Sequence, residues 1–470
     1  MVFSSILFLS IFLPTTLLVY LLLPWQKARN LWLLAVSLFF YAWGEGPFVL
    51  VLLSTTLLGW GFGLAIQNAT RRRRLTLIGG VSLALGILIY FKYSTFIVDN
   101  LNNVFGWQLH SPFPDIAKHL PIGISFVTFQ VISYLIDVYR GEVSAEPRLL
   151  NMAVYKSFFG KLIAGPIVRY ADIKEQLASR SVTVDGFNEG IYRFGIGIGK
   201  KVIIANCMGE IADKIFGLPI NSLPAGLAWL GAFAYTFQIY FDFSGYSDIA
   251  IGLARMFGFR FKENFNQPYL STSITEFWQR WHISLSSWFR DYLWFPLGSN
   301  RHGPLRTYLN LLIVFFFCGL WHGASWNFVV WGLFHGCFLV FERALGSKVK
   351  FRPAAGIAFV YTLVVIIVGW VCFRAPDLTV AGKYLSRMFL PGGEVDVQAV
   401  RMASVELLNK YYLFHFFLAI FFCFLMPKLQ ARLPILQRQP ARLSFALLVL
   451  VIAMIYLSGT TYNPFIYYRF

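Results

Sequence analysis

The sequence has few charged residues for its length. Asp, Glu, Lys and Arg together make up 13% of 470 residues, against a usual share of about 25%. Hydrophobic residues make up 57%, and the mean hydropathy is +0.62. This composition excludes a soluble protein and predicts one that crosses a membrane many times. The apolar runs are continuous rather than alternating, so the spans are predicted to be helices and not strands of a barrel.

Acidic residues are scarcer than basic ones, 22 against 40, for a net charge of +18. The basic residues form short clusters between apolar runs, such as Lys27 with Arg29 and the four arginines at 71–74. Such clusters are typical of cytoplasmic anchoring at span ends. We therefore expect the lipid bilayer, and no nucleic acid, as a partner. The N-terminus is predicted to lie outside and the region at 92–120 to lie on the same side.

Cysteine-based and nucleotide-binding motifs are missing. The five cysteines show no CxxC spacing, which indicates no disulfide framework or zinc site. There is also no HExxH, no GxSxG and no Walker loop. Residues 195–201 contain three alternate glycines before two lysines, which favours close helix packing over phosphate binding. The catalytic chemistry that these exclusions leave open is a histidine acting as general base without a local carboxylate partner.

Apolar runs define the predicted spans and a single membrane domain over residues 1–470. We expect about eleven true crossings, with re-entrant or interfacial helices besides, because several runs are shorter than a perpendicular span needs. The region 375–410 is the largest predicted excursion from the membrane. The candidate segments are 5–23, 31–44, 47–66, 75–91, 121–139, 151–169, 190–208, 225–252, 307–322, 325–342, 356–374, 411–426 and 443–458.

Polar residues inside these runs are the candidates for function. In the stretch 238–248, Asp242 and Asp248 lie among hydroxyl groups. They either bond neighbouring helices or line a polar cavity. In the stretch 273–292, Ser273 and Glu276 form a capping box that predicts a helix from about Ile274.

This predicted helix is amphipathic and is expected to lie at the membrane interface or to tilt steeply. His282 falls near the edge of its apolar face. It is either a functional residue or a core histidine bonded to a backbone carbonyl. Arg280 and Arg290 lie on the charged face, where they meet either the phosphates of an acyl donor or lipid headgroups.

The stretch 307–342 is too long for one span and is predicted to break at 323–325. His322 would lie about 22 Å of helix rise from Thr307, well inside the bilayer. An imidazole there needs a partner, and its neighbour Gly323 leaves room for a ligand, so we predict a functional role. His335 would sit about 220° further round a continuous helix, so a metal pair with His322 is not predicted.

Two segments resemble the signature segments of the membrane-bound O-acyltransferase family. They are Arg280-Trp-His-Ile-Ser-Leu-Ser with Trp288-Phe-Arg-Asp-Tyr, and Gly319-Leu-Trp-His-Gly. The likeness covers nearly the whole chain and is strongest to the bacterial branch that O-acetylates polysaccharides. Further strings that carry it are Pro121-Ile-Gly-Ile-Ser-Phe, Ser133-Tyr-Leu-Ile-Asp-Val-Tyr-Arg, Ala164-Gly-Pro, Tyr240-Phe-Asp-Phe-Ser-Gly-Tyr-Ser-Asp, Met1-Val-Phe-Ser-Ser and Pro464-Phe-Ile-Tyr.

The resemblance implies an all-α polytopic bundle in the bacterial inner membrane that acts as an O-acetyltransferase. It implies His322 as the catalytic histidine and His282 as the second motif histidine, with acetyl-CoA as cytoplasmic donor and no bound cofactor. The acetyl group would pass across the membrane to an SGNH-type partner of a polysaccharide export complex. Alginate is the expected polymer, with cellulose or peptidoglycan as alternatives. The residues that bind the donor are not predicted.

Two other classes of function are compatible with a polar, glycine-broken bundle. One is a transporter or flippase, which would be expected to show an inverted repeat that this sequence lacks. The other is a non-catalytic subunit of an export complex. Both rank behind acyl transfer because neither accounts for the two histidine segments.

Overall fold

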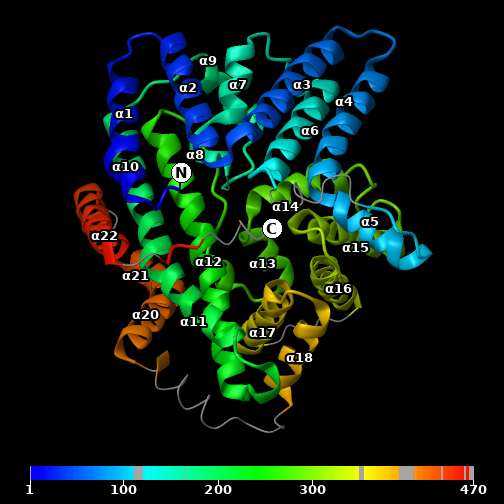
Figure 1. The fold of residues 1–470 in the computed structure, drawn as a ribbon, viewed down its shortest axis with the longest axis vertical. Coiled ribbons are helices and arrows are strands. Elements are labelled where there is room, and N and C mark those ends of the chain that lie inside the picture. Colours follow the sequence, from blue (N-terminus) through cyan, green and yellow to red (C-terminus); the bar gives the residue numbers. More distant parts are fainter. Residues whose placement is uncertain are drawn as a thin grey trace. The chain divides into compact units, whose positions relative to one another are not determined.

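The computed structural model describes residues 2–110, 120–163, 165–348, 354–390, 406–407, 409–433, 435, 438–459 and 462–464. Within these residues the chain is helical and contains no strand, which confirms the predicted all-α class (Figure 1). The chain divides into two compact units, Met1–Phe194 with Ile249–Lys262 and Gly195–Asp248 with Glu263–Phe470. The single membrane domain over residues 1–470 stays a prediction.

The first unit holds most of the N-terminal helices. They are α1 (Leu13–Leu22), α2 (Gln26–Glu45), α3 (Val49–Asn68), α4 (Arg73–Leu88), α5 (Ser94–Phe105), α6 (Ile124–Arg140), α7 (Leu149–Ser157), α8 (Phe159–Leu162), α9 (Tyr170–Ala178) and the first part of α10 (Val184–Gly199).

Glycine allows close packing of α3 and α4 against α6. An added Cβ at Gly63 would lie 2.6 Å from the Tyr134 ring, and one at Gly80 would lie 2.9 Å from Leu135. Both distances are shorter than ordinary contacts, so a larger residue at either position would displace the neighbouring side chain.

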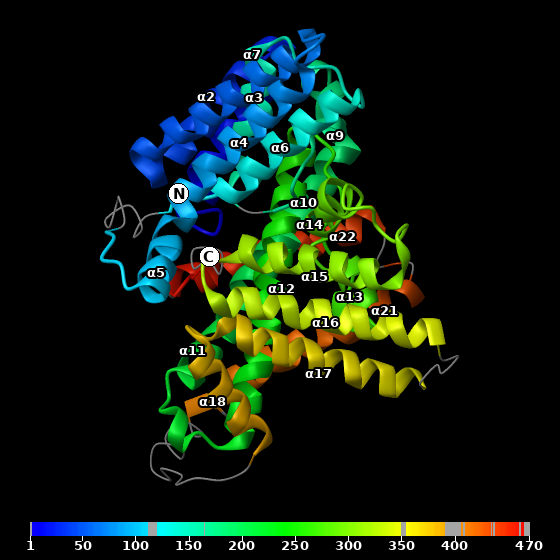
Figure 2. The same ribbon diagram turned by 90° about the vertical axis from the view of Figure 1, so that its right-hand side faces the viewer.

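The second unit holds the remaining helices. They are α11 (Asn206–Phe216), most of α12 (Ala225–Met256), α13 (Ile274–Arg280), α14 (Ile283–Phe289), α15 (Gly303–His322), α16 (Trp326–Lys348), α17 (Ala355–Arg374), α18 (Leu378–Phe389), α20 (Lys410–Ile420), α21 (Met426–Arg432) and α22 (Gln439–Gly459). In Figure 2, α15, α16 and α17 lie side by side.

Short helical turns of other types join or extend these helices. The π-helical turns are Phe8–Phe12, Ile89–Tyr93, Lys200–Ala205, Arg290–Trp294 and Phe421–Leu425. The 3-10 turns are Gly46–Phe48, Ile220–Ser222 and Pro268–Leu270.

Helices α15 and α16 form a tight hairpin that ends at the predicted break. Helix α15 ends at His322 and α16 begins at Trp326. An added Cβ at Gly319 would lie 2.2 Å from the backbone oxygen of Phe328. Only glycine permits backbones this close, so the hairpin holds His322 at a defined place beside α16.

Seven helical stretches of the described chain are long and apolar enough to cross a membrane. The chain is therefore a multi-pass membrane protein, while the number of about eleven crossings stays a prediction. The first stretch contains both α2 and α3, which are joined by the 3-10 turn Gly46–Phe48. The seven are Gln26–Asn68, Arg73–Phe105, Gly303–His322, Trp326–Gly346, Ala355–Arg374, Lys410–Gln430 and Gln439–Gly459.

One predicted segment is broken in the structure, and another contains a helix. The segment 151–169 is not one helix, because α7 ends at Ser157 and α8 begins at Phe159, after Phe158 departs from helical backbone angles. Proline at 166 then prevents a further helical turn through that position. In the predicted excursion 375–410, residues 378–389 form α18. Residues 391–405 and 408 of that excursion lie outside the described part of the chain.

Candidate functional site

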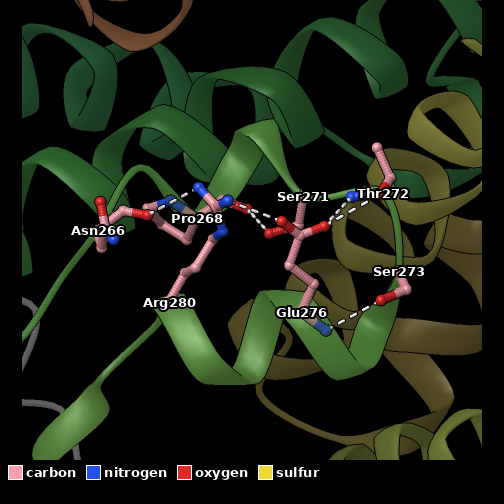
Figure 3. Close-up of polar contacts among 7 residues, drawn as sticks. All are labelled: Asn266, Pro268, Ser271, Thr272, Ser273, Glu276 and Arg280. Atoms are coloured by element: carbon pink, nitrogen blue, oxygen red, sulfur yellow. Dashed lines mark hydrogen bonds and ion pairs between the residues drawn. The ribbon is translucent and has the colours of Figure 1, made fainter. Parts of the chain in front are cut away.

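The capping box predicts the start of α13 correctly. The Ser273 hydroxyl accepts a hydrogen bond from the Glu276 backbone N–H at 3.0 Å, and the helix begins at Ile274 (Figure 3). The Glu276 carboxylate accepts from the Thr272 backbone N–H at 2.8 Å and from its hydroxyl at 3.0 Å. Burial alone would raise the pKa of Glu276. The bonds from Thr272 and the ion pair with Arg280 lower this pKa below its ordinary value of 4.5.

A second carboxylate reaches the same helix end from α16. Glu342 accepts hydrogen bonds from the backbone N–H groups of Ile274 at 2.6 Å and Thr275 at 2.9 Å. It also accepts from the Thr275 hydroxyl at 2.7 Å. Negative charge at a helix N-terminus satisfies backbone donors that have no partner within the helix. Two carboxylates therefore fix where α13 begins relative to α16.

The helix does not continue through residue 292, which corrects the prediction of one amphipathic helix. Helix α13 ends at Arg280 and α14 starts at Ile283. Between them His282 has φ +43°, in the left-handed region that few non-glycine residues adopt. The tertiary partner of this turn is Asn264, whose backbone oxygen accepts from the Ile283 N–H at 2.9 Å. The contact comes from a distant segment, so helical periodicity could not indicate it.

His282 is completely buried at this turn. Its Nδ1 lies 3.3 Å from the Asn264 side-chain oxygen and 3.4 Å from the Ser284 hydroxyl. Its ring stands edge-on to Phe243, with the ring centroids 4.6 Å apart. Burial lowers the pKa of His282 from 6.5 to about 3, so the imidazole is neutral near neutral pH.

His322 is the last residue of α15 and is 5% exposed. Aromatic rings surround it at near right angles. The centroid distances are 4.9 Å to Trp321, 5.1 Å to Trp331 and 5.2 Å to Phe373. This enclosure excludes bulk water from around the imidazole and restricts its orientation.

The structure brings the two motif histidines to one side chain. The Trp321 indole contacts His282 with ring centroids 6.0 Å apart, and it also contacts His322. Both imidazoles are buried and both belong to the second unit. A reacting hydroxyl and an acyl group held beside Trp321 would lie within reach of one or both imidazoles.

His335 belongs to α16 and contacts different groups. Its ring lies 5.2 Å from Trp331 and 5.3 Å from Trp278, centroid to centroid. Trp331 also contacts His322, so its indole lies against both imidazoles. Among the described residues, no three His, Cys, Asp or Glu side chains lie close enough to hold a metal ion.

The acidic stretch on α12 pairs with two lysines. Asp242 forms an ion pair with Lys201 at 2.8 Å, and Asp248 forms one with Lys200 at 2.7 Å. Of the two alternatives for this stretch, the contacts favour bonding between helices. The glycines before these lysines pack closely, since an added Cβ at Gly199 would lie 2.3 Å from Val449.

The two arginines of the 273–292 stretch are paired with carboxylates of the same stretch. Arg280 bonds Glu276 at 2.7 Å and Arg290 bonds Asp291 at 2.7 Å (Figure 3 for the first pair). These contacts give no indication that either arginine binds the phosphates of an acyl donor. The residues that bind an acyl donor stay unassigned.

Asn264 is the residue at this site that the sequence did not single out. It lies outside any recognisable motif, and its link to His282 depends on the packing of two loops. An asparagine in a polar loop segment gives no signal by spacing alone.

Comparison with known proteins shows extensive similarity. A family model described as membrane-bound O-acyltransferase matches residues 89–381. The "Probable alginate O-acetylase AlgI" of Pseudomonas putida is 42% identical over 494 aligned residues, which cover 100% of both chains. The protein of that name from Pseudomonas aeruginosa is 49% identical, covering 83% of this chain and 75% of its own. The peptidoglycan O-acetyltransferase of Helicobacter pylori is 35% identical, covering 87% and 84%.

Proposed function

Because this chain belongs to the membrane-bound O-acyltransferase family, we propose that it supplies acetyl groups for O-acetylation of exported alginate. The proposed donor is cytoplasmic acetyl-CoA, and the proposed location is the bacterial inner membrane. The observation that carries the proposal is the placement of His282 and His322 against Trp321 in a buried site. The names of the relatives from the two Pseudomonas species support alginate as the polymer.

In the proposed reaction His322 is the general base. Its neutral imidazole takes the proton of an acceptor hydroxyl while the hydroxyl oxygen attacks the thioester carbon. The new C–O bond forms, the C–S bond breaks, and the proton passes from His322 to the leaving sulfur. The surrounding rings of Trp331 and Phe373 keep water from competing with the acceptor.

His282 has two possible roles in this reaction. It either orients the acceptor or donates a hydrogen bond to the oxyanion that develops on the thioester. Both roles require His282 to stand near the reacting groups, and its contact with Trp321 supports this requirement.

The proposed immediate acceptor is a hydroxyl of an SGNH-type partner in the export complex. His322 is 5% exposed and enclosed by aromatic rings, so a bulky polymer would reach it less readily than one side chain would. The partner would then pass the acetyl group to the polymer. On this proposal the chain alone hydrolyses acetyl-CoA slowly and acetylates no polymer.

The decisive experiment uses the purified full chain in liposomes with acetyl-labelled acetyl-CoA. Label should reach alginate only when an SGNH-type partner is added, and His322→Ala should abolish that transfer. His110→Ala is the matched control, because His110 is an exposed histidine of the first unit. Transfer at the wild-type rate by His322→Ala would refute the assignment. Efficient acetylation of polymer by the chain alone would refute the relay.

Peptidoglycan is a second candidate polymer, which the Helicobacter pylori relative favours. The same assay compares alginate with peptidoglycan fragments, each with its corresponding partner. Preferential labelling of peptidoglycan would replace alginate in the proposal without changing the chemistry at His322.

A further inference from the structure

The amide of Asn264 has a defined orientation next to His282. Its side-chain oxygen accepts a hydrogen bond from the Ser284 backbone N–H at 3.1 Å, and a backbone N–H can only donate. Its side-chain nitrogen donates to the Ser247 hydroxyl at 3.1 Å. Asn264 is completely buried, so no solvent competes for either end. The atom that Asn264 presents to His282 is therefore an acceptor.

The Ser284 hydroxyl is the second neighbour of the same ring nitrogen. Its oxygen lies 2.8 Å from the Asn264 side-chain oxygen and 3.4 Å from Nδ1 of His282. A hydroxyl has one proton, and the shorter contact takes it because the Asn264 oxygen can only accept. Ser284 therefore also presents an acceptor to His282.

If Nδ1 of His282 were unprotonated, its lone pair would face the lone pairs of the Asn264 and Ser284 oxygens, and this contact would be repulsive. We propose that Asn264 and Ser284 hold neutral His282 as the tautomer with its proton on Nδ1, so that Nε2 is a hydrogen-bond acceptor in the acyl-transfer site. Asn264 is then a positioning residue, since it acts on the reaction through the imidazole. Its backbone oxygen also holds the turn at His282 through Ile283.

This assignment rests on the proposed function and chooses between the two roles given above for His282. A neutral ring with its proton on Nδ1 cannot donate from Nε2 to an oxyanion. His282 instead orients a reactant by accepting a hydrogen bond through Nε2. Because His322 takes the single proton of the reacting hydroxyl, the bond to His282 comes from another N–H or O–H group of the bound reactants.

The tautomer is measured directly by ¹⁵N magnetic resonance on the full chain in lipid nanodiscs, with ¹⁵N-labelled histidine. An unprotonated ring nitrogen and an N–H nitrogen have well separated shifts, and loss of signals in His282→Gln assigns the residue. We expect protonated Nδ1 and unprotonated Nε2 in the wild type at pH 7. A proton on Nε2 overturns the proposal. This readout needs no turnover, so it stands even if the proposed function fails.

Two variants of Asn264 test the positioning role. Asn264→Asp keeps an acceptor and should keep the Nδ1–H tautomer, whereas Asn264→Leu removes it and should shift the proton toward Nε2. In the acetyl-transfer assay, Asn264→Leu should lower kcat by on the order of tenfold to a hundredfold, with Asn264→Asp restoring most of it. The KM for acetyl-CoA should stay unchanged in both.

The outcomes distinguish a positioning role of Asn264 from a purely structural role. An unaltered tautomer in folded Asn264→Leu would overturn the role of Asn264, as would an Asn264→Asp protein that is folded but as inactive as Asn264→Leu. If Asn264→Leu fails to fold, the wild-type spectrum still decides the tautomer. A wild type with the Nδ1–H tautomer but no acetyl transfer would refute the proposed function alone.

Discussion

The imidazoles of His282 and His322 both stand edge-on to the same indole, that of Trp321, with ring centroids 6.0 Å and 4.9 Å from it. The first histidine lies in a turn between two short helices, and the second ends a long one. The indole is thus the common surface on which two separate segments are aligned.

Trp321→Phe should reduce acyl transfer without removing the protein from the membrane. The smaller ring cannot contact both imidazoles, and misplacement by about 1 Å can cost on the order of a hundredfold in rate. We expect kcat in the acetyl-transfer assay to fall by about tenfold or more, with little change in KM for the donor. Trp326→Phe is the matched control, since Trp326 is 53% exposed. Equal loss in both variants would contradict a specific role for Trp321.

Gly332→Ala should separate α15 from α16. An added Cβ at Gly332 would lie 2.2 Å from the Phe315 backbone oxygen, which cannot move without shifting α15. Overpacking of this kind costs about 1–3 kcal/mol, so the thermal unfolding midpoint in detergent should fall. Because His322 ends α15, acetyl transfer should fall as well. Gly346→Ala is the control on the same helix, as nothing lies within 4 Å of its added Cβ.

Acid should weaken the cap of α13 through Glu276. Its pKa is lowered on folding, so its carboxylate stabilises the protein fully above the ordinary value of 4.5. That contribution is lost as pH falls through the lower pKa of the folded state. The thermal unfolding midpoint of the wild type should therefore fall with pH below about 4.5, and Glu276→Gln should flatten this dependence. The same slope in wild type and Glu276→Gln would contradict the assignment.

The topology prediction is tested in the first unit by cysteine labelling in intact spheroplasts. Arg72→Cys should be protected from an impermeant thiol reagent, because the arginine cluster is expected in the cytoplasm. His110→Cys should be labelled from outside. A Cys337→Ala background is used because Cys337 is an exposed native thiol. The reverse pattern would invert the topology and place the donor on the wrong face.

Several features of this protein follow from local sequence alone. Continuous apolar runs indicate membrane helices because a bilayer forces each span to satisfy its own backbone. Ser273 and Glu276 predict the start of α13 because a capping box acts over three residues, and Gly323 marks the end of α15 for a similarly local reason. The motif segments around His282 and His322 indicate the family, since they are short strings of chemically distinctive residues.

Tertiary structure alone decided the geometry of the site. Periodicity places His282 on a continuous helix, but a contact with Asn264 eighteen positions earlier breaks that helix and holds the residue in a left-handed turn. The tautomer of His282 depends on the same contact. The meeting of His282 and His322 at Trp321 likewise depends on how α13, α15 and α16 pack. Such contacts form between segments that no local propensity connects, because burial of side chains in a shared core outweighs the preference of each segment by itself.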